Sequence, residues 1–216
     1  MLILSLISNP VNFIYFVIAL IIGITIHEFA HAWSAYKLGD PTPKLMKRLT
    51  LNPLAHLDPV GTLFLFLAGF GWGKPVLFNP INFKNPKKAI IITAFSGAIA
   101  NIIVALIFSI PYRLNLYFNL GLENYWFYTL FDFIVVLNLF LAAFNILPLP
   151  PLDGSKIFYL FVSPRKMAAF EKIGVAILFT LLAISFISNF NFLYYILTHI
   201  VNWLLYLVRV FPASPI

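Results

Sequence analysis

The amino-acid sequence predicts an α-helical polytopic membrane protein. Of its 216 residues, 62% are hydrophobic and only 10% are charged, and the mean hydropathy is +0.95. Soluble domains are closer to half apolar and a quarter charged. Several apolar runs also reach the roughly 20 residues that a helix needs to cross a bilayer, and the cationic residues lie mostly between these runs.

The apolar runs that we expect to cross the membrane lie at 11–36, 89–111, 126–147, 173–188 and 190–208. A further apolar stretch at 60–72 is too short to cross as a helix, and it ends in the sequence GFGWGKP (69–75). Three glycines and a proline disfavour a continuous helix there, and irregular backbone at membrane depth is tolerated only against protein or a water-filled cavity. We therefore expect about five to six transmembrane segments with a short re-entrant or β-hairpin segment near residues 60–75. An interfacial hairpin is the alternative.

The distribution of positive charge predicts the orientation. If the first span runs from outside to inside and the stretch at 60–72 enters and leaves on the inner side, Arg113 alone of the 14 Lys and Arg residues falls outside. Cytoplasmic loops carry such an excess of cations. If 60–72 crossed the membrane, every later loop would change sides and the bias would largely cancel.

The composition excludes several classes of protein. The chain has no cysteine, so disulfide frameworks, thiolate metal sites and a cysteine nucleophile are excluded. Its 14 Lys and Arg against 7 Asp and Glu make it basic, but no basic stretch has the character of a nucleic-acid site, and the cations are interpreted as anchors at the membrane edge. The length suits one membrane-embedded domain over 1–216, with a catalytic core at about 11–160 and a C-terminal helical hairpin at about 166–210.

The first span contains the motif His27-Glu28-Phe29-Ala30-His31. Residues four apart on a helix differ by about 40° and lie about 6 Å apart along the axis, so both imidazoles can reach one metal ion. Glu28 is then next to the remaining coordination position, as in zinc hydrolases. The motif lies roughly 13 Å below the inner end of the helix, where ionisable groups are costly and indicate function. The alternative is that these side chains only form hydrogen bonds to neighbouring helices.

Catalytic zinc usually has three protein ligands, so a third must come from elsewhere. Asp153 ends the sequence NILPLPPLD (145–153) after the third long span. Its prolines favour an extended chain that can fold back towards the cavity. Asp40 and Asp58 are also on the inner side, in loops near the anchors. An Asp before Gly is in addition a common turn signal, which is the alternative for Asp153.

These motifs resemble those of the site-2 protease family of intramembrane zinc metalloproteases, peptidase family M50. The HEFAH motif is similar to the zinc helix of the family, and NILPLPPLDG (145–154) is similar to its second motif, whose aspartate is the third ligand. Further similar segments occur in the order of the family, with Ala98 where a proline is more usual: LNP to HLDPVGT (51–62), GWGKPV (71–76) and SGAIAN (96–101). The chain resembles a compact member that lacks the inserted PDZ domain.

The resemblance implies one zinc ion per chain, held by His27, His31 and Asp153, with Glu28 as the general base. It also implies that the re-entrant stretch offers an extended edge to an unwound substrate. Two further asparagines and a histidine are candidates for contact with the substrate or oxyanion. These are Asn101, Asn145 and His56. A contact between helices is the alternative for each asparagine, and a loop histidine without a role is the alternative for His56.

The predicted function is hydrolysis of peptide bonds within or near the transmembrane segments of membrane proteins in the cell membrane, at a site open to the cytoplasm. A zinc or proton transporter is one alternative, but the spans beyond the site offer almost no polar path to the outer side. A catalytically silent relative that acts as a membrane chaperone is another. A membrane zinc protease that trims prenylated peptides would share the HEFAH motif but not the segment 145–154.

Overall fold

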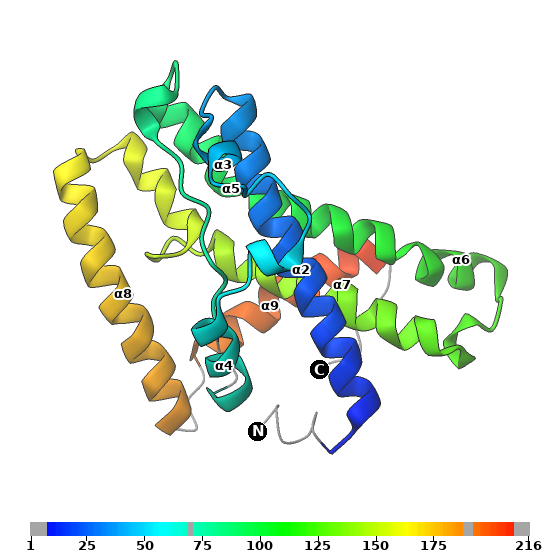
Figure 1. The fold of residues 1–216 in the computed structure, drawn as a ribbon. Coiled ribbons are helices and arrows are strands. Elements are labelled where there is room, and N and C mark those ends of the chain that lie inside the picture. Colours follow the sequence, from blue (N-terminus) through cyan, green and yellow to red (C-terminus); the bar gives the residue numbers. More distant parts are fainter. Residues whose placement is uncertain (1–7, 69–70, 188–191, 210–216) are drawn as a thin grey trace.

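Three long helices form the centre of the protein. The computed structural model describes residues 8–68, 71–187 and 192–209 (Figure 1). Helices α2 (Pro10–Lys37), α5 (Pro86–Phe108) and α7 (Trp126–Ile146) each contact the other two. Both α2 and α5 begin with a proline, which suits the first helical turn because its missing N–H would have no partner there. The asparagine before each proline caps the helix by accepting a backbone N–H three residues further on.

Shorter elements surround these three helices. The apolar side of α9 (Phe192–Arg209) packs on α7, where Leu197 and Leu205 join Leu139 in a large buried cluster. Figure 1 shows α8 (Pro164–Ile187) standing apart from α2, and its main contacts with other helices are with η4 (Asp153–Leu160) and α9. The remaining described helices and 3-10 turns are α3 (Thr42–Leu45), η1 (Pro53–Ala55), α4 (Pro59–Ala68), η2 (Pro80–Asn82), α6 (Ile110–Phe118), η3 (Leu122–Asn124), η4 (Asp153–Leu160), α8 (Pro164–Ile187) and α9 (Phe192–Arg209).

The helices agree with the prediction of an α-helical membrane protein. Three helical stretches of the described residues are long and apolar enough to cross a bilayer: α2, the continuous stretch Pro86–Phe118 formed by α5 and α6, and α7. The expected spans at 173–188 and 190–208 correspond to α8 and to the shorter apolar helix α9, and their junction lies outside the described residues. The number of five to six spans stays a prediction.

The region near residues 60–75 divides into a short helix and an extended segment. The Phe- and Leu-rich part forms α4, and residues 69–70 lie outside the described residues. From Trp72 to Asn79 the chain is extended, and one antiparallel bridge joins Leu57 to Gly73. No β-strand occurs in the parts of the chain that the structure describes, so the expected hairpin stays a prediction. We call residues 72–79 the strap.

Hydrogen bonds to its main chain hold the strap along its length. The Lys74 N–H donates to the His56 carbonyl at 2.7 Å, and Nη1 of Arg48 donates to the Lys74 carbonyl at 3.3 Å. At the far end, the Asn79 N–H donates to Asp40 Oδ2 at 2.6 Å. Figure 1 shows the strap as a teal thread that returns from α4 towards α3. The loops that follow α2 thus fix the strap beside that helix.

Candidate metal centre

The two histidines of the HEFAH motif face the inside of the helical core. His27 and His31 are each 7% exposed, and their Nε2 atoms lie 3.0 Å apart. Gly97 of α5 lies against both rings. A Cβ at this position would stand 2.6 Å from His27 Cε1 and 2.7 Å from His31 Nε2. The glycine therefore makes the space on α5 into which the two imidazoles fit.

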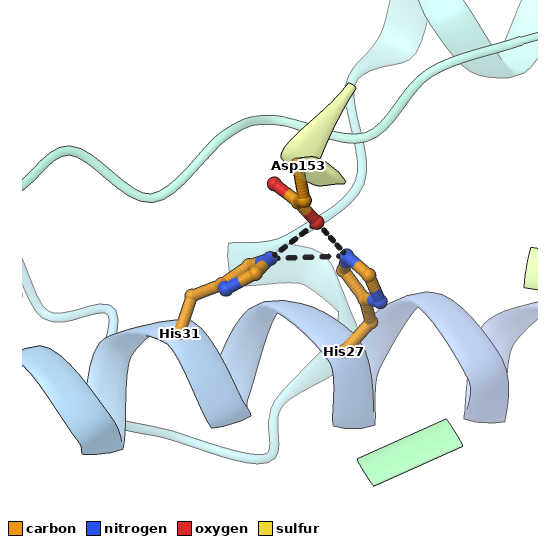
Figure 2. A group of neighbouring side chains, drawn as sticks. All are labelled: His27, His31 and Asp153. Carbon is orange, nitrogen blue, oxygen red and sulfur yellow. Dashed lines mark hydrogen bonds and ion pairs between the residues drawn. The ribbon is translucent and has the colours of Figure 1, made fainter. Parts of the chain in front are cut away.

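Asp153 reaches the histidines from a loop that breaks away from α7. The helix ends at Ile146, and a turn closed by the bond from the Leu152 N–H to the Leu149 carbonyl leads into η4. The next residue must be a glycine, Gly154, because a Cβ at this position would overlap the Ile146 carbonyl. Oδ2 of Asp153 lies 3.0 Å from His27 Nε2 and 3.1 Å from His31 Nε2 (Figure 2).

Hydrogen bonds on the far side of each ring determine which nitrogen carries the proton. His31 Nδ1 lies 2.7 Å from the Thr93 carbonyl oxygen, which can only accept, so Nδ1 is the donor. His27 Nδ1 lies 2.6 Å from Asn101 Oδ1. The orientation of the Asn101 amide is fixed because its Nδ2 donates to the Gly23 carbonyl at 3.1 Å, so His27 Nδ1 is also a donor. In a neutral imidazole the other nitrogen, Nε2, then presents a lone pair.

Three electron-rich atoms therefore converge: two Nε2 lone pairs and a carboxylate oxygen (Figure 2). Burial acts to raise the pKa of Asp153, but the neighbouring His31 and His27 outweigh it and hold that pKa below its ordinary value, so the carboxylate is ionised. This arrangement needs a positive charge at its centre, either a proton on an imidazole or a metal ion.

The donor set and its spacing fit zinc. Two imidazole nitrogens and one carboxylate oxygen are a common set in catalytic zinc sites. Their separations of 3.0–3.1 Å are close to the roughly 3.3 Å edge of a tetrahedron of ligands about 2.0 Å from the metal. The carbonyl and amide that accept from the two Nδ1–H groups are the kind of outer partner that orients a metal-bound imidazole.

Glu28, the residue after His27, has its carboxylate against the strap. Its Oε2 accepts the Val76 N–H at 3.1 Å. A Cβ on Gly73 would stand 3.8 Å from Oε1, so the strap passes the carboxylate closely. The described hydrogen bonds involve Oε2 only, which leaves Oε1 to accept a proton.

The three candidates for substrate contact have different surroundings. Asn101 is fully buried and bonds to His27, Gly23 and Asn138. Asn145 is half-buried and donates to the carbonyl of Leu141 in its own helix at 3.0 Å. His56 is fully buried under the strap and bonds through Nε2 to the Thr50 carbonyl at 2.8 Å. Of the three, the described contacts link Asn101 directly to a predicted metal ligand.

Sequence reasoning missed two side chains that support the site. Asn138 of α7 is fully buried beside Asn101, and its only signal in the sequence is an amide inside an apolar span. Asp40 is fully buried and accepts hydrogen bonds from Asn79 and Asn82 of the chain around the strap. From the sequence alone, Asp40 is only one of the candidates for a third ligand.

Comparison with known proteins identifies the family. The model of "Peptidase family M50" matches residues 114–187, which include Asp153. The chain is also 42% identical over 178 residues to "Putative zinc metalloprotease YwhC" of Bacillus subtilis, a match that covers 77% of this chain and 79% of that protein. This chain belongs to peptidase family M50. The assignment confirms the family predicted from the motifs and its zinc cofactor, and His27, His31 and Asp153 are a group that could hold the ion.

Other M50 relatives match a smaller share of their own length. "Putative zinc metalloprotease Rip2" of Mycolicibacterium smegmatis is 26% identical over 154 residues, which are 66% of this chain but 55% of Rip2. "Zinc metalloprotease MJ0392" of Methanocaldococcus jannaschii is 24% identical over 162 residues, 75% of this chain and 38% of that protein. The chain thus spans about half, or less, of these two relatives. No solved structure matches the chain significantly.

Proposed function

We propose that this M50 chain is an intramembrane zinc metalloprotease that hydrolyses peptide bonds within or next to the transmembrane segments of other membrane proteins. His27, His31 and Asp153 hold the zinc ion, and Glu28 is the general base. The observation that carries the proposal is the convergence of the Asp153 carboxylate on two Nε2 atoms whose Nδ1–H groups are engaged elsewhere. The catalytic site belongs to a single membrane-embedded domain and opens to the cytoplasm.

When bound, zinc would polarise the scissile carbonyl and lower the pKa of the attacking water. The strap holds Glu28 through Oε2, so Oε1 is the atom that takes the proton from the attacking water. The same oxygen then returns the proton to the leaving amine. The protein groups needed for general acid–base catalysis are thus supplied by one side chain.

The strap supports a role in binding an extended substrate. A helical substrate hides its peptide bonds in its own hydrogen bonds, and pairing with an extended edge would expose them. The strap is the extended segment beside Glu28, and the exposed Leu77 marks a part of it that faces outward. A transmembrane segment that unwinds at this edge would bring its backbone next to the zinc ligands.

The test is cleavage of a single-span membrane reporter by the purified chain in detergent, together with its zinc content. We expect one zinc ion per chain and a cut in or beside the reporter span, mapped by mass spectrometry. Bound zinc without cleavage of any of a panel of single-span reporters would instead support the silent relative. A chain that binds no zinc after metal-replete purification would overturn the proposed site.

A further inference from the structure

Two fully buried asparagines lie in the centre of the helical core. Asn101 of α5 and Asn138 of α7 are both 0% exposed. A buried amide is costly unless its groups are hydrogen-bonded, and polar side chains inside membrane helices are rare unless they serve packing or function. Asn138 also lies where α2 and α7 meet closely. A Cβ on Gly23 of α2 would stand 3.5 Å from Asn138 Oδ1 and 2.6 Å from Leu141 Cδ1.

The two amides form a directed chain of hydrogen bonds that ends at His27. Asn138 Nδ2 donates to the Ile134 carbonyl at 2.8 Å, which leaves Asn138 Oδ1 to accept from Asn101 Nδ2 at 2.7 Å. Asn101 Nδ2 also donates to the Gly23 carbonyl at 3.1 Å. Asn101 Oδ1 then accepts the His27 Nδ1–H at 2.6 Å. Main-chain carbonyls fix both amide orientations, so the direction of the chain is determined.

We propose that Asn138 is a positioning residue for zinc, acting on His27 through Asn101. Asn138 occupies the second N–H of the Asn101 amide, and this bond holds the amide with Oδ1 towards His27 Nδ1. In a connected chain each bond polarises the next, so the acceptor that His27 meets is stronger than an isolated amide. The result is an imidazole fixed in rotation, with its Nε2 lone pair directed at Asp153 and His31. The inference rests on the zinc site of the proposed function and extends it to α7.

Three substitutions that keep the branched shape of the side chain separate this role from simple packing. Asn138→Leu removes both hydrogen bonds and keeps the branched shape and the number of side-chain heavy atoms. Asn138→Asp introduces a carboxyl that is neutral in a membrane core and therefore supplies one acceptor and one donor, as the amide does. Asn202→Leu makes the same change in α9, where the structure shows no hydrogen bond to the Asn202 Oδ1 atom, and it serves as the matched control.

The measurement is zinc affinity by chelator competition on the purified full chain, with the absorption spectrum of the cobalt-substituted protein as a second readout. Loss of an outer partner of a ligand typically weakens metal binding 10- to 100-fold. We expect Asn138→Leu to lose about 10-fold in affinity and to change the cobalt spectrum. Asn138→Asp should keep both close to wild type, and Asn202→Leu should match wild type.

Wild-type affinity and an unchanged cobalt spectrum in Asn138→Leu would overturn the inference while leaving the proposed function intact. Equal losses in Asn138→Leu and Asn138→Asp would also overturn it, because packing alone would then explain the effect. Failure of the wild type to bind zinc would remove the proposed function and this inference together.

If Asn138→Leu does not fold, nitrogen-15 NMR of the four histidines in the zinc-bound wild type decides. His27 must bind through Nε2 with a hydrogen-bonded Nδ1–H, and binding through Nδ1 would refute the relay.

Discussion

The Val76 N–H donates a hydrogen bond of 3.1 Å to Oε2 of Glu28. This bond connects the strap to the second residue of the HEFAH motif across 48 positions of sequence. It occupies one carboxylate oxygen, and the described hydrogen bonds leave the other free to accept a proton. Glu28 is thus held in place by main chain, and its protonation chemistry can be tested separately from metal binding.

Glu28→Gln is expected to abolish cleavage and to retain zinc. The glutamine oxygen can still accept the Val76 N–H, but an amide cannot take a proton from water. The rate should fall by about 10²- to 10⁴-fold, the usual contribution of a general base. The measurements are cleavage of the single-span reporter and zinc per chain by mass spectrometry. Activity near wild type in Glu28→Gln would rule out its role as base.

Removal of any one ligand should remove zinc. His27→Ala, His31→Ala and Asp153→Ala each take one donor atom from the proposed three-ligand site, and we expect zinc affinity to fall by at least about 100-fold, beyond the loss seen for outer partners. His199→Ala is the matched control, because His199 is exposed on α9 and bonds to the Tyr195 carbonyl of its own helix. Stoichiometric zinc in His31→Ala would contradict the ligand assignment.

Gly97→Ala should weaken zinc binding without unfolding α5. Alanine is the better helix former, yet its Cβ would stand 2.6–2.7 Å from atoms of both imidazoles. The rings must then move, and we expect lower zinc content with unchanged helicity by circular dichroism. Ile99→Leu, at an exposed position two residues along α5, controls for changes in this part of the helix. Full zinc occupancy in Gly97→Ala would show that the rings can shift without loss.

Asp40→Asn should loosen the strap. Asp40 accepts hydrogen bonds from Thr42, Asn79 and Asn82. In Asp40→Asn one of the two oxygens becomes an NH2 group, which cannot accept a hydrogen bond and would face some of these N–H and O–H groups. A buried donor without a partner costs roughly 1–3 kcal/mol. Because the chain has no cysteine, the rate of maleimide labelling of Leu77→Cys reports on the strap alone. We expect faster labelling in Asp40→Asn than in Asp58→Asn, where the side chain has only to accept the Gly61 N–H.

The hydrogen bonds between Asp40 and the end of the strap should weaken in acid. Burial acts to raise the pKa of Asp40, but hydrogen bonds from Thr42, Asn82 and Asn79 outweigh it and lower the pKa below its ordinary value. A carboxylate with a lowered pKa in the folded state stabilises the fold above its unfolded pKa of about 3.9 and loses this contribution as pH falls further. Labelling of Leu77→Cys should therefore be constant above about pH 4 and rise below it. A rise already at pH 6 would indicate another group.

Sidedness can be tested with the same cysteine-free background. The charge distribution predicts that Lys84 lies inside and that the connection between α6 and α7 lies outside. A membrane-impermeant maleimide added to intact cells should therefore label Leu120→Cys, whose native side chain is exposed, and should label Lys84→Cys only after the membrane is opened. The reverse pattern would invert the orientation and direct the site away from the cytoplasm.

The sequence was sufficient for the features that depend on local spacing. The four-residue interval of His27 and His31 placed both rings on one helix face, and the prolines before Asp153 indicated that the chain leaves α7 there. Roles that depend on which helices face each other could not be read in this way. Asn138 is one amide in an apolar helix, and only the packing of α7 against α2 and α5 shows that it meets Asn101. The Thr93 carbonyl that orients His31 is a main-chain atom and leaves no trace in the sequence.

The strap shows a second limit of the sequence. Gly71 and Gly73 correctly indicate irregular backbone where the strap begins, but not which groups hold the strap. From its charge alone, Arg48 is interpreted as a membrane anchor. Asp40 is interpreted, on the same basis, as a candidate metal ligand. In the structure Arg48 donates to the Ala55 and Lys74 carbonyls, and Asp40 accepts from Asn79. Such contacts between loops depend on the path of the chain after α4, which local patterns do not determine.

The proposed zinc ligands His27 and Asp153 are separated by 126 positions along the chain. During synthesis the first helix is made long before the loop that carries the carboxylate, and domains form as the chain emerges from the ribosome. A nascent chain that has not yet reached residue 153 therefore holds only two of the three donors. Metal acquisition must be a late event in biogenesis, so an incomplete chain left in the bilayer would carry no hydrolytic activity towards its neighbours.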